Sequence, residues 1–261
     1  MIKKIHVALT IAGSDSGGGA GIQADLKTFA AMGVHGTSAI TCLTAQNPGR
    51  VLGIEPCPPQ MLRRQLEAVF QELRPAAAKT GMLFSAGNVR VVADFQKEHS
   101  LPLVVDPVLV STSGANLLQS GALKIFTGRL LPLATLVTPN LFEAEILSGQ
   151  KISSVEDMGD AARKIHARFG CAVLVKGGHL RQARRATDIF FNGRVETLLD
   201  APLVKGIPTH GTGCVYSAAI CAALAQGKRL SEAVRIGKQF VTRAISKSYH
   251  VRQHFALGIG R

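Results

Sequence analysis

The sequence lacks several features that whole classes of protein require. It has no tryptophan and only two tyrosines, and its five cysteines are scattered without any CxxC pair. An odd and dispersed set of cysteines argues against a disulfide framework or a zinc knuckle and favours a reducing compartment. The apolar run at residues 5–12 is too short for a signal peptide, and no run reaches the roughly 20 residues of a transmembrane helix. We therefore expect a soluble, cytoplasmic protein without a membrane partner.

The composition is that of a folded, basic protein. Hydrophobic residues make up 46% of the 261 residues, which excludes a disordered chain. The net charge of +13 arises in residues 163–261, which hold 17 Lys or Arg against 4 Asp or Glu, whereas residues 1–162 hold 13 of each sign. A one-sided excess of this kind suggests an anionic partner such as nucleic acid, an anionic membrane or phosphates.

A nucleic-acid-binding protein is one alternative that the basic part of the chain raises. The scarcity of aromatic residues and the absence of RGG, zinc-finger and RNP patterns argue against it. The short cluster of Arg181, Arg184 and Arg185 is typical of a solvated loop. We expect no nucleic-acid partner.

Short apolar runs alternate with amphipathic stretches along most of the chain, a pattern typical of a parallel α/β sheet. The expected strands cover 5–12, 37–45, 76–82, 101–108, 135–140 and 171–178. The expected helices cover 20–32, 59–73, 86–98, 155–169, 213–226 and 231–247. Residues 186–199 flank Asn192-Gly193 with β-rich runs and predict a hairpin. The sequence therefore predicts a three-layer α/β/α sandwich with a mostly parallel central sheet and a small antiparallel edge.

Polar side chains follow five of the expected strands at or just past their carboxyl ends. They are Asp15, Gln46, Asp106, Asn140 and Lys176. Each alone is explained by structural capping, but the carboxyl ends of parallel strands share one edge of the sheet. The set therefore predicts a site there.

The first glycine loop, residues 13–21, contains Gly19-x-Gly21-x-x-Ala24 between an expected strand and helix. This spacing matches the dinucleotide fingerprint, but the acidic residue expected about 20 positions later is missing. The phosphate-loop pattern GxxxxGK[ST] and the protein-kinase motifs are also absent. A nicotinamide enzyme, a P-loop kinase and a protein kinase are therefore disfavoured or excluded.

The second glycine loop, His210-Gly-Thr-Gly-Cys214, leads directly into an alanine-rich helix. Backbone amides at such a helix start can surround an anion. The helix terminus is expected to lower the pKa of Cys214, which could then take a proton from a substrate hydroxyl. A buried cysteine that packs as a small apolar side chain is an equal alternative at this point.

Taken in order, the motifs resemble one known family. They are the GxGxxA loop with Asp25, TAQN at 44–47, Asp106-Pro-Val108, TPNxxEA at 138–144, KGGH at 176–179 and HGTGC at 210–214. Together they resemble the hydroxymethylpyrimidine and phosphomethylpyrimidine kinases of thiamine biosynthesis, within the ribokinase-like superfamily. The resemblance runs from about residue 5 to about 247, so we expect residues 1–261 to form a single ribokinase-like kinase domain.

The resemblance implies phosphate transfer from Mg²⁺-ATP to 4-amino-5-hydroxymethyl-2-methylpyrimidine, followed by phosphorylation of the monophosphate to the diphosphate. Cys214 would be the base where many superfamily members carry Asp, and Gly211, Thr212 and Gly213 would form the anion hole. Glu143 and Asp106 would bind the metal. Lys176 and Asn140 would bind the phosphates of ATP. The pyrimidine pocket would draw on Gly13, Asp25, Gln46, Met82 and Val108. For Asp25 the alternative is a solvated helix residue, and for Met82 and Val108 it is core packing.

The resemblance also implies a homodimer and leaves one enzymatic alternative open. Pyridoxal or pyridoxine kinases of the same superfamily also phosphorylate a hydroxymethyl group on a flat ring. The chain departs from the family at Thr112, where many relatives carry lysine, and at Val215-Tyr216 after Cys214. Its end, Ala256 to Arg261, also differs from the usual histidine-containing terminus.

Overall fold

The computed structural model describes residues 5–109, 117–119, 121–178, 180, 185–204 and 210–260. One nine-stranded sheet runs through it in the order β3-β2-β1-β4-β5-β6-β7-β8-β9. The strands are β1 (Val7–Asp15), β2 (His35–Asn47), β3 (Arg50–Pro56), β4 (Ala77–Thr80), β5 (Leu103–Val105), β6 (Leu136–Val137), β7 (Ala172–Lys176), β8 (Arg185–Phe191) and β9 (Glu196–Pro202). Strands β2, β1, β4, β5, β6 and β7 are parallel, whereas β3, β8 and β9 add antiparallel pairs at the two edges.

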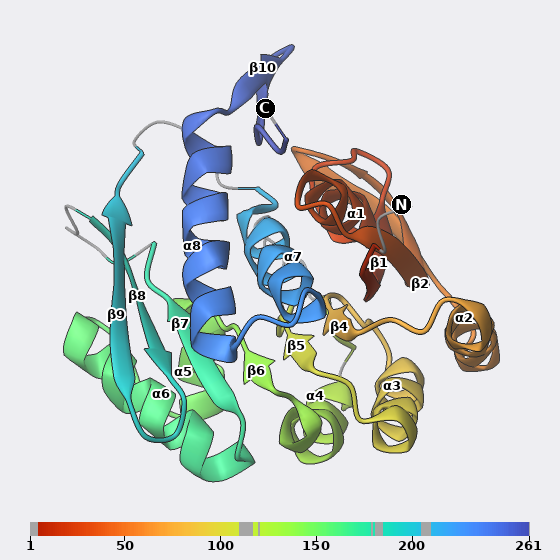
Figure 1. Cartoon of the computed structure of the whole chain (residues 1–261), viewed down its shortest axis with the longest axis horizontal. Helices are drawn as coiled ribbons and strands as arrows, with labels where there is room; N and C mark the ends of the chain where they lie inside the picture. The colour runs from red at the N-terminus through yellow and green to blue at the C-terminus, as the bar shows by residue number, and fades with distance from the viewer. Residues whose placement is uncertain are drawn as a thin grey trace.

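Helices cover both faces of this sheet (Figure 1). On one face lie α1 (Gly21–Ala31), α7 (Thr212–Ala225) and α8 (Leu230–Ser246), whose apolar residues join one buried cluster. On the other lie α2 (Pro59–Glu72), α3 (Ala86–His99), α4 (Ala122–Ile125) with the turns η1 (Phe126–Leu130) and η2 (Leu131–Leu133), α5 (Leu141–Ser148) and α6 (Val155–Phe169). A small hairpin of β10 (Tyr249–Val251) and β11 (His254–Ala256) follows α8. The expected α/β/α sandwich with a mostly parallel sheet is confirmed.

The hydrophobic pattern of each element explains its place in the layers. The middle strands β4, β5 and β6 are buried at every position, as expected for strands covered on both faces. Helix α7 is apolar almost all round, and ten of its residues are buried because it packs between the sheet and its neighbours α1 and α8. Helix α6 instead buries one stripe and exposes the opposite face.

The structure corrects the expected boundaries at several places. The hairpin around Asn192 and Gly193 is confirmed, with Phe191 paired to Glu196. Edge strand β3 and the hairpin β10–β11 have short, weakly alternating sequences and were not expected. Thr112 lies outside the described residues. In the described part of the chain, no helix is long and apolar enough to cross a membrane.

Candidate active site

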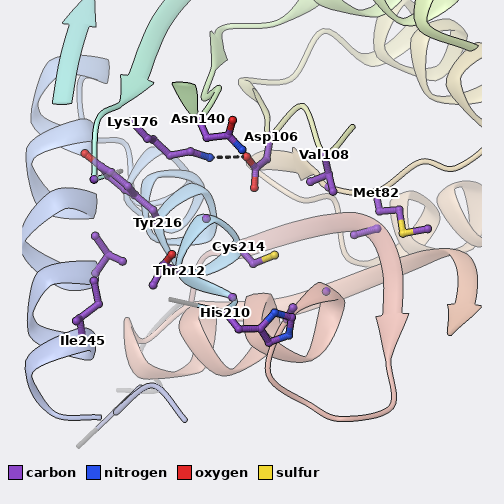
Figure 2. A pocket seen from close by; sticks show the side chains of 18 of the residues that line it. Met82, Asp106, Val108, Asn140, Lys176, His210, Thr212, Cys214, Tyr216 and Ile245 are labelled. Atoms are coloured by element: carbon purple, nitrogen blue, oxygen red, sulfur yellow. Dashed lines mark hydrogen bonds and ion pairs between the residues drawn. The ribbon is translucent and has the colours of Figure 1, made fainter. Parts of the chain in front are cut away.

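A cavity of about 310 Å³ opens at the carboxyl edge of the parallel strands. All five polar residues expected at strand ends line it: Asp15, Gln46, Asp106, Asn140 and Lys176. Figure 2 shows Met82 and Val108 toward one end of the cavity and Tyr216 and Ile245 toward the other, with Cys214 between them. The structure therefore confirms that these separate segments converge on one site.

Asp106, which follows β5, pairs with Lys176 in the cavity wall. Asp106 Oδ1 accepts hydrogen bonds from Lys176 Nζ at 2.9 Å and from the Thr138 hydroxyl at 3.2 Å. Its other carboxylate oxygen accepts one from the Ser217 hydroxyl at 3.3 Å. Burial opposes the charge of Asp106, but the positive charges of Lys176 and Lys79 prevail and lower its pKa. Asp106 is therefore ionised at neutral pH.

Glu143 lies at the start of α5, where the chain forms a capping box. Asn140 Oδ1 accepts a hydrogen bond from the backbone N–H of Glu143 at 2.9 Å. In return, Glu143 Oε2 accepts one from the backbone N–H of Asn140 at 2.8 Å. Burial raises the pKa of Glu143 to about 7, and the charge of Asp106 acts in the same direction while Lys176 opposes it. The cavity thus contains one ionised carboxylate and one that titrates near neutral pH.

The two carboxyl groups fit the requirements of a magnesium ion. Mg²⁺ commonly takes one or two carboxylates and keeps several waters. Asp106 and Glu143 are both buried in the cavity wall and repel each other when both are ionised. A divalent cation would relieve this repulsion, so the donor set suits it.

The start of α7 brings the second glycine loop to the same cavity. Gly211, Thr212, Gly213 and Cys214 all line it. Gly211 has φ +81°, and a Cβ atom at this position would overlap the carbonyl oxygen of Gly19. A Cβ atom on Gly213 would lie 3.4 Å from Lys176 Nζ. The two glycines therefore allow the backbone to approach the first glycine loop and the lysine closely.

His210 and Asp15 also connect the two glycine loops. Asp15 accepts hydrogen bonds from the amides of Gly17, Gly19 and Ala20, and His210 Nε2 lies 3.7 Å from its Oδ2 atom. Burial opposes the charge of Asp15, but hydrogen bonds from His210 and the loop amides prevail and lower its pKa. Asp15 therefore organises the first glycine loop beside the start of α7.

The environment of Cys214 corrects the expectation that its pKa is lowered. Burial raises the pKa of the thiol to about 11 despite the nearby charge of Lys79 and a hydrogen bond with the Gly21 backbone. The charges of Asp25 and Asp106 add to the rise. Desolvation outweighs the helix terminus here, so the thiol carries its proton at neutral pH in the unliganded protein.

Four of the five residues expected to bind the pyrimidine line the cavity: Gly13, Gln46, Met82 and Val108. A Cβ atom at Gly13 would lie 2.8 Å from Cys42 Sγ and 3.5 Å from Met82 Sδ, so a larger residue there would have to displace Cys42. Gln46 presents a half-buried amide, which offers a donor and an acceptor.

Asp25, by contrast, does not line the cavity and is not a solvated helix residue. Its side chain is fully buried, and both carboxylate oxygens lie 2.8 Å from Lys79 Nζ. Asp25 thus lies behind the residues that line the cavity, and its contact with the substrate stays a prediction. Asp25 is in α1 and turns toward the sheet, because Thr10 and Lys79 offer it the donors that a buried carboxylate requires.

Several cavity residues were not expected from the sequence. Lys79 in β4 is one, and a charged residue in the otherwise apolar run 76–82 was the available signal. At the other end, Lys238 Nζ donates to Asp188 Oδ2 at 2.7 Å, and both line the cavity beside Tyr216. That pair joins residues 50 positions apart, which local sequence patterns do not connect.

A lysine, two buried carboxyl groups and a glycine-rich helix start supply the positioning and charge neutralisation that phosphoryl transfer requires. With its α/β/α fold, the protein is of the class of small-molecule kinases with a ribokinase-like fold.

Comparisons with known proteins identify the family. The profile of the phosphomethylpyrimidine kinase family matches residues 15–257. A hydroxymethylpyrimidine/phosphomethylpyrimidine kinase of Rhizobium meliloti is 47% identical over 241 residues, which cover 92% of this chain and 90% of the relative. The chain therefore belongs to the phosphomethylpyrimidine kinase family and is an enzyme.

A thiamine biosynthesis bifunctional protein of Geobacter sulfurreducens is 48% identical over 238 residues, which cover 91% of this chain. The chain spans about half of that relative's length, since the match covers 48% of it.

Solved structures agree with the fold. A Bacillus subtilis pyridoxal kinase in complex with ADP has a TM-score of 0.91 and 38% identity, and the match covers 98% of each chain. A phosphomethylpyrimidine kinase from Clostridium difficile has a TM-score of 0.82 and 41% identity, covering 93% of this chain and all of the other. Kinases for two different acceptors therefore share this architecture.

Proposed function

We propose that the protein phosphorylates 4-amino-5-hydroxymethyl-2-methylpyrimidine with ATP and then phosphorylates the resulting monophosphate to the diphosphate. One observation carries this proposal. One cavity holds Cys214 and the start of α7 between Met82 and Val108 at one end and Tyr216 and Ile245 at the other, and Gln46 also lines it. Family membership supports the same activity. Because strands of one sheet span residues 7–202, we also propose one kinase domain over residues 1–261.

In the proposed reaction, the oxygen of the substrate hydroxymethyl group bonds to the γ-phosphorus of ATP, and the bond to the bridging oxygen of ADP breaks. Cys214 takes the hydroxyl proton after its own thiol proton has been lost to solvent, so the thiolate is the base in this step. The amides of Gly211, Thr212 and Gly213 stabilise the negative charge of the transferring phosphoryl group. The high pKa of the thiol favours the protonated product of this transfer.

The part of the cavity wall formed by Asp106, Asn140, Glu143 and Lys176 is proposed to hold the nucleotide phosphates and the metal. Lys176, fixed by Asp106, would neutralise phosphate charge, and Asn140 at the start of α5 would face the same phosphates. Asp106 and Glu143 would hold Mg²⁺, directly or through its waters, and the ion would supply charge neutralisation for the phosphates. ADP in the related pyridoxal kinase supports a nucleotide site in this fold.

At the acceptor end, we propose that Gly13, Gln46, Met82 and Val108 bind the pyrimidine. The Gln46 amide can pair with the edge of an aminopyrimidine, and Met82 and Val108 supply an apolar surface against the ring. Asp25 is left out of this contact set because it lies outside the cavity wall.

We also propose that the protein is a cytoplasmic homodimer. Leu52 of the edge strand β3 is 63% exposed, and Leu43 of the neighbouring strand β2 is 56% exposed. Large exposed apolar side chains on these two strands support a contact between two copies of the chain there. Charged substitutions at both positions should yield a monomer by light scattering.

A comparison of acceptors tests the proposed substrate. Pyridoxal kinase activity is the second candidate, because the fold of this chain matches that of a pyridoxal kinase with a TM-score of 0.91. ATP consumption should be measured with hydroxymethylpyrimidine and with pyridoxal over the same concentration range, with products identified by mass. We expect a higher kcat/KM with hydroxymethylpyrimidine; turnover of pyridoxal alone would reject the proposal.

A further inference from the structure

Lys79 and Asp25 form a completely buried ion pair next to the active site. Both side chains have no exposed surface, and Lys79 Nζ lies 2.8 Å from each carboxylate oxygen of Asp25. Asp25 Oδ2 also accepts a hydrogen bond from the Thr10 hydroxyl at 2.7 Å. The pair therefore joins α1, β1 and β4 and holds the ammonium group in one orientation.

Stability alone gives a poor reason for placing this pair in the core. Removing two charges from water is costly, and apolar residues of similar volume are often equally or more stabilising at such positions. The chain neighbours Ala24, Ala77 and Ala78 are apolar and completely or almost completely buried, so the pair stands in the interior of the fold. A buried charge kept in such surroundings points to a function of the charge itself.

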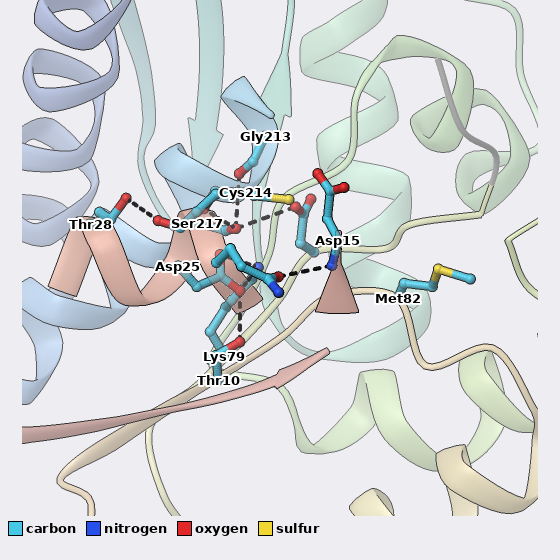
Figure 3. A network of polar contacts seen from close by, with 12 residues as sticks. Thr10, Asp15, Asp25, Thr28, Lys79, Met82, Gly213, Cys214 and Ser217 are labelled. Atoms are coloured by element: carbon cyan, nitrogen blue, oxygen red, sulfur yellow. Dashed lines mark hydrogen bonds and ion pairs between the residues drawn. The ribbon is translucent and has the colours of Figure 1, made fainter. Parts of the chain in front are cut away.

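The location of Lys79 indicates what that function is. Lys79 and Cys214 line the same cavity, and Figure 3 shows Lys79, Asp25 and Thr10 grouped near the start of α7, where Cys214 lies. Although burial raises the pKa of Cys214, the charge of Lys79 lowers it, and the charges facing this thiol are those of Lys79, Lys176, Asp25 and Asp106. Lys176 is paired with Asp106 in the cavity wall, whereas Lys79 is the completely buried cation that acts on Cys214.

We propose that Lys79 is a positioning residue for phosphoryl transfer, held by Asp25 and Thr10 so that its ammonium group stabilises negative charge at Cys214. Lys79 forms no bond to the substrate and keeps its protons throughout the reaction. Asp25 acts one step further away, because it holds and orients Lys79. This inference rests on the proposed role of Cys214. It also gives the Asp25 carboxylate a role in the reaction although Asp25 does not line the cavity.

The test replaces the whole pair by apolar residues in the double variant Lys79→Met/Asp25→Leu. This change leaves no unpaired buried charge, so we expect a thermal unfolding midpoint close to that of the unmodified protein or above it. We expect kcat to fall by at least about tenfold, as for loss of support to a general base, with KM for ATP and for the acceptor changed less than about threefold. A folded double variant with kcat within about threefold of the unmodified protein would overturn the proposal.

A single variant and a control make the test decisive. Asp25→Asn leaves Lys79 buried without a counter-charge, so Lys79 should lose its proton and kcat should again fall by at least about tenfold. If the double variant does not fold, this variant decides alone, and an unchanged kcat rejects the proposal. Val92→Ala, in α3 on the opposite face of the sheet, lowers stability without reaching the cavity and should keep kcat. All variants are assayed with whichever of hydroxymethylpyrimidine and pyridoxal the unmodified protein phosphorylates, so a different substrate does not affect the result.

Discussion

At the scale of single residues, burial controls the chemistry of the site. Asp106 and Glu143 share one cavity wall, yet the pKa of Asp106 is lowered whereas that of Glu143 is raised to about 7. The difference follows from the direct ion pair between Asp106 and Lys176. At Cys214, burial outweighs the nearby charge of Lys79 and raises the pKa to about 11.

The role of Cys214 leads to a direct prediction. Cys214→Ala removes the proposed proton acceptor but leaves the amides at the start of α7 in place, so kcat should fall about 100-fold or more. Binding of a non-hydrolysable ATP analogue, measured by calorimetry, should be unchanged. Cys57→Ala is the matched control, since Cys57 lies outside the cavity wall. Near-normal turnover by Cys214→Ala would remove this residue from the role of base.

Sequence patterns predict some site residues better than others. Asp106 and Gln46 could be predicted because the carboxyl ends of parallel strands meet at one edge of a sheet. The partner of Asp25 could not, because Lys79 lies 54 positions away and only the packing of α1 against the sheet brings them together. The pKa of Cys214 was also missed, since the sequence reveals the helix start but not the depth of burial.

At the scale of elements, glycine and capping residues fix the segments that carry the site. The start of α7 requires Gly211, whose backbone is left-handed and touches the first glycine loop. The start of α5 depends on the capping box of Asn140 and Glu143. The GxGxxA loop and the HGTGC segment were recognisable in the sequence, but their direct contact was not.

The contact between the glycine loops can be tested with two glycine substitutions. Gly211→Ala should displace the start of α7 and reduce kcat by about 100-fold, as expected for loss of aligned anion-hole amides. Gly227→Ala is the matched control, because it has a similar φ of +80° but nothing within 4 Å of its Cβ position. Both variants bear the same backbone strain, so equal kcat values for them would contradict the importance of the loop contact.

The capping box of α6 gives a prediction for pH dependence. Asp157 accepts from the amides of Ser153 and Ser154 and from the Ser153 hydroxyl, and these bonds lower its pKa to about 2. A lowered pKa in the folded state means that this stabilisation is present above pH 3.8 and is lost as pH falls toward 2.

Asp157→Asn should therefore lower the thermal unfolding midpoint at pH 7, and the difference should shrink between about pH 4 and 2. Glu156→Gln, one position earlier in the same helix turn, serves as the control. A difference that stays constant with pH would show that the charge of Asp157 contributes nothing to the cap.

At the scale of the whole molecule, the charge asymmetry agrees with an anionic nucleotide substrate. The excess of positive charge lies in residues 163–261, which also contribute Lys176, Lys238 and the start of α7 to the cavity. A positive field of this kind would help to attract ATP and a phosphorylated acceptor. Composition alone left nucleic acid and membranes open as partners, whereas the ordered motifs identified the family.

The architecture as a whole was largely predictable, because alternating buried strands and amphipathic helices leave few alternatives to a parallel α/β sheet. The edge strand β3 and the hairpin β10–β11 were not predicted. Both are short, and their exposed positions give little hydrophobic pattern.

The most direct test of the central claim is the second phosphorylation. Purified protein should be incubated with ATP, Mg²⁺ and hydroxymethylpyrimidine monophosphate, and the products followed by mass. We predict that one ADP and one pyrimidine diphosphate form for each ATP consumed, and that Cys214→Ala slows the formation of both by about 100-fold or more. An unmodified protein that leaves the monophosphate unchanged would contradict the account.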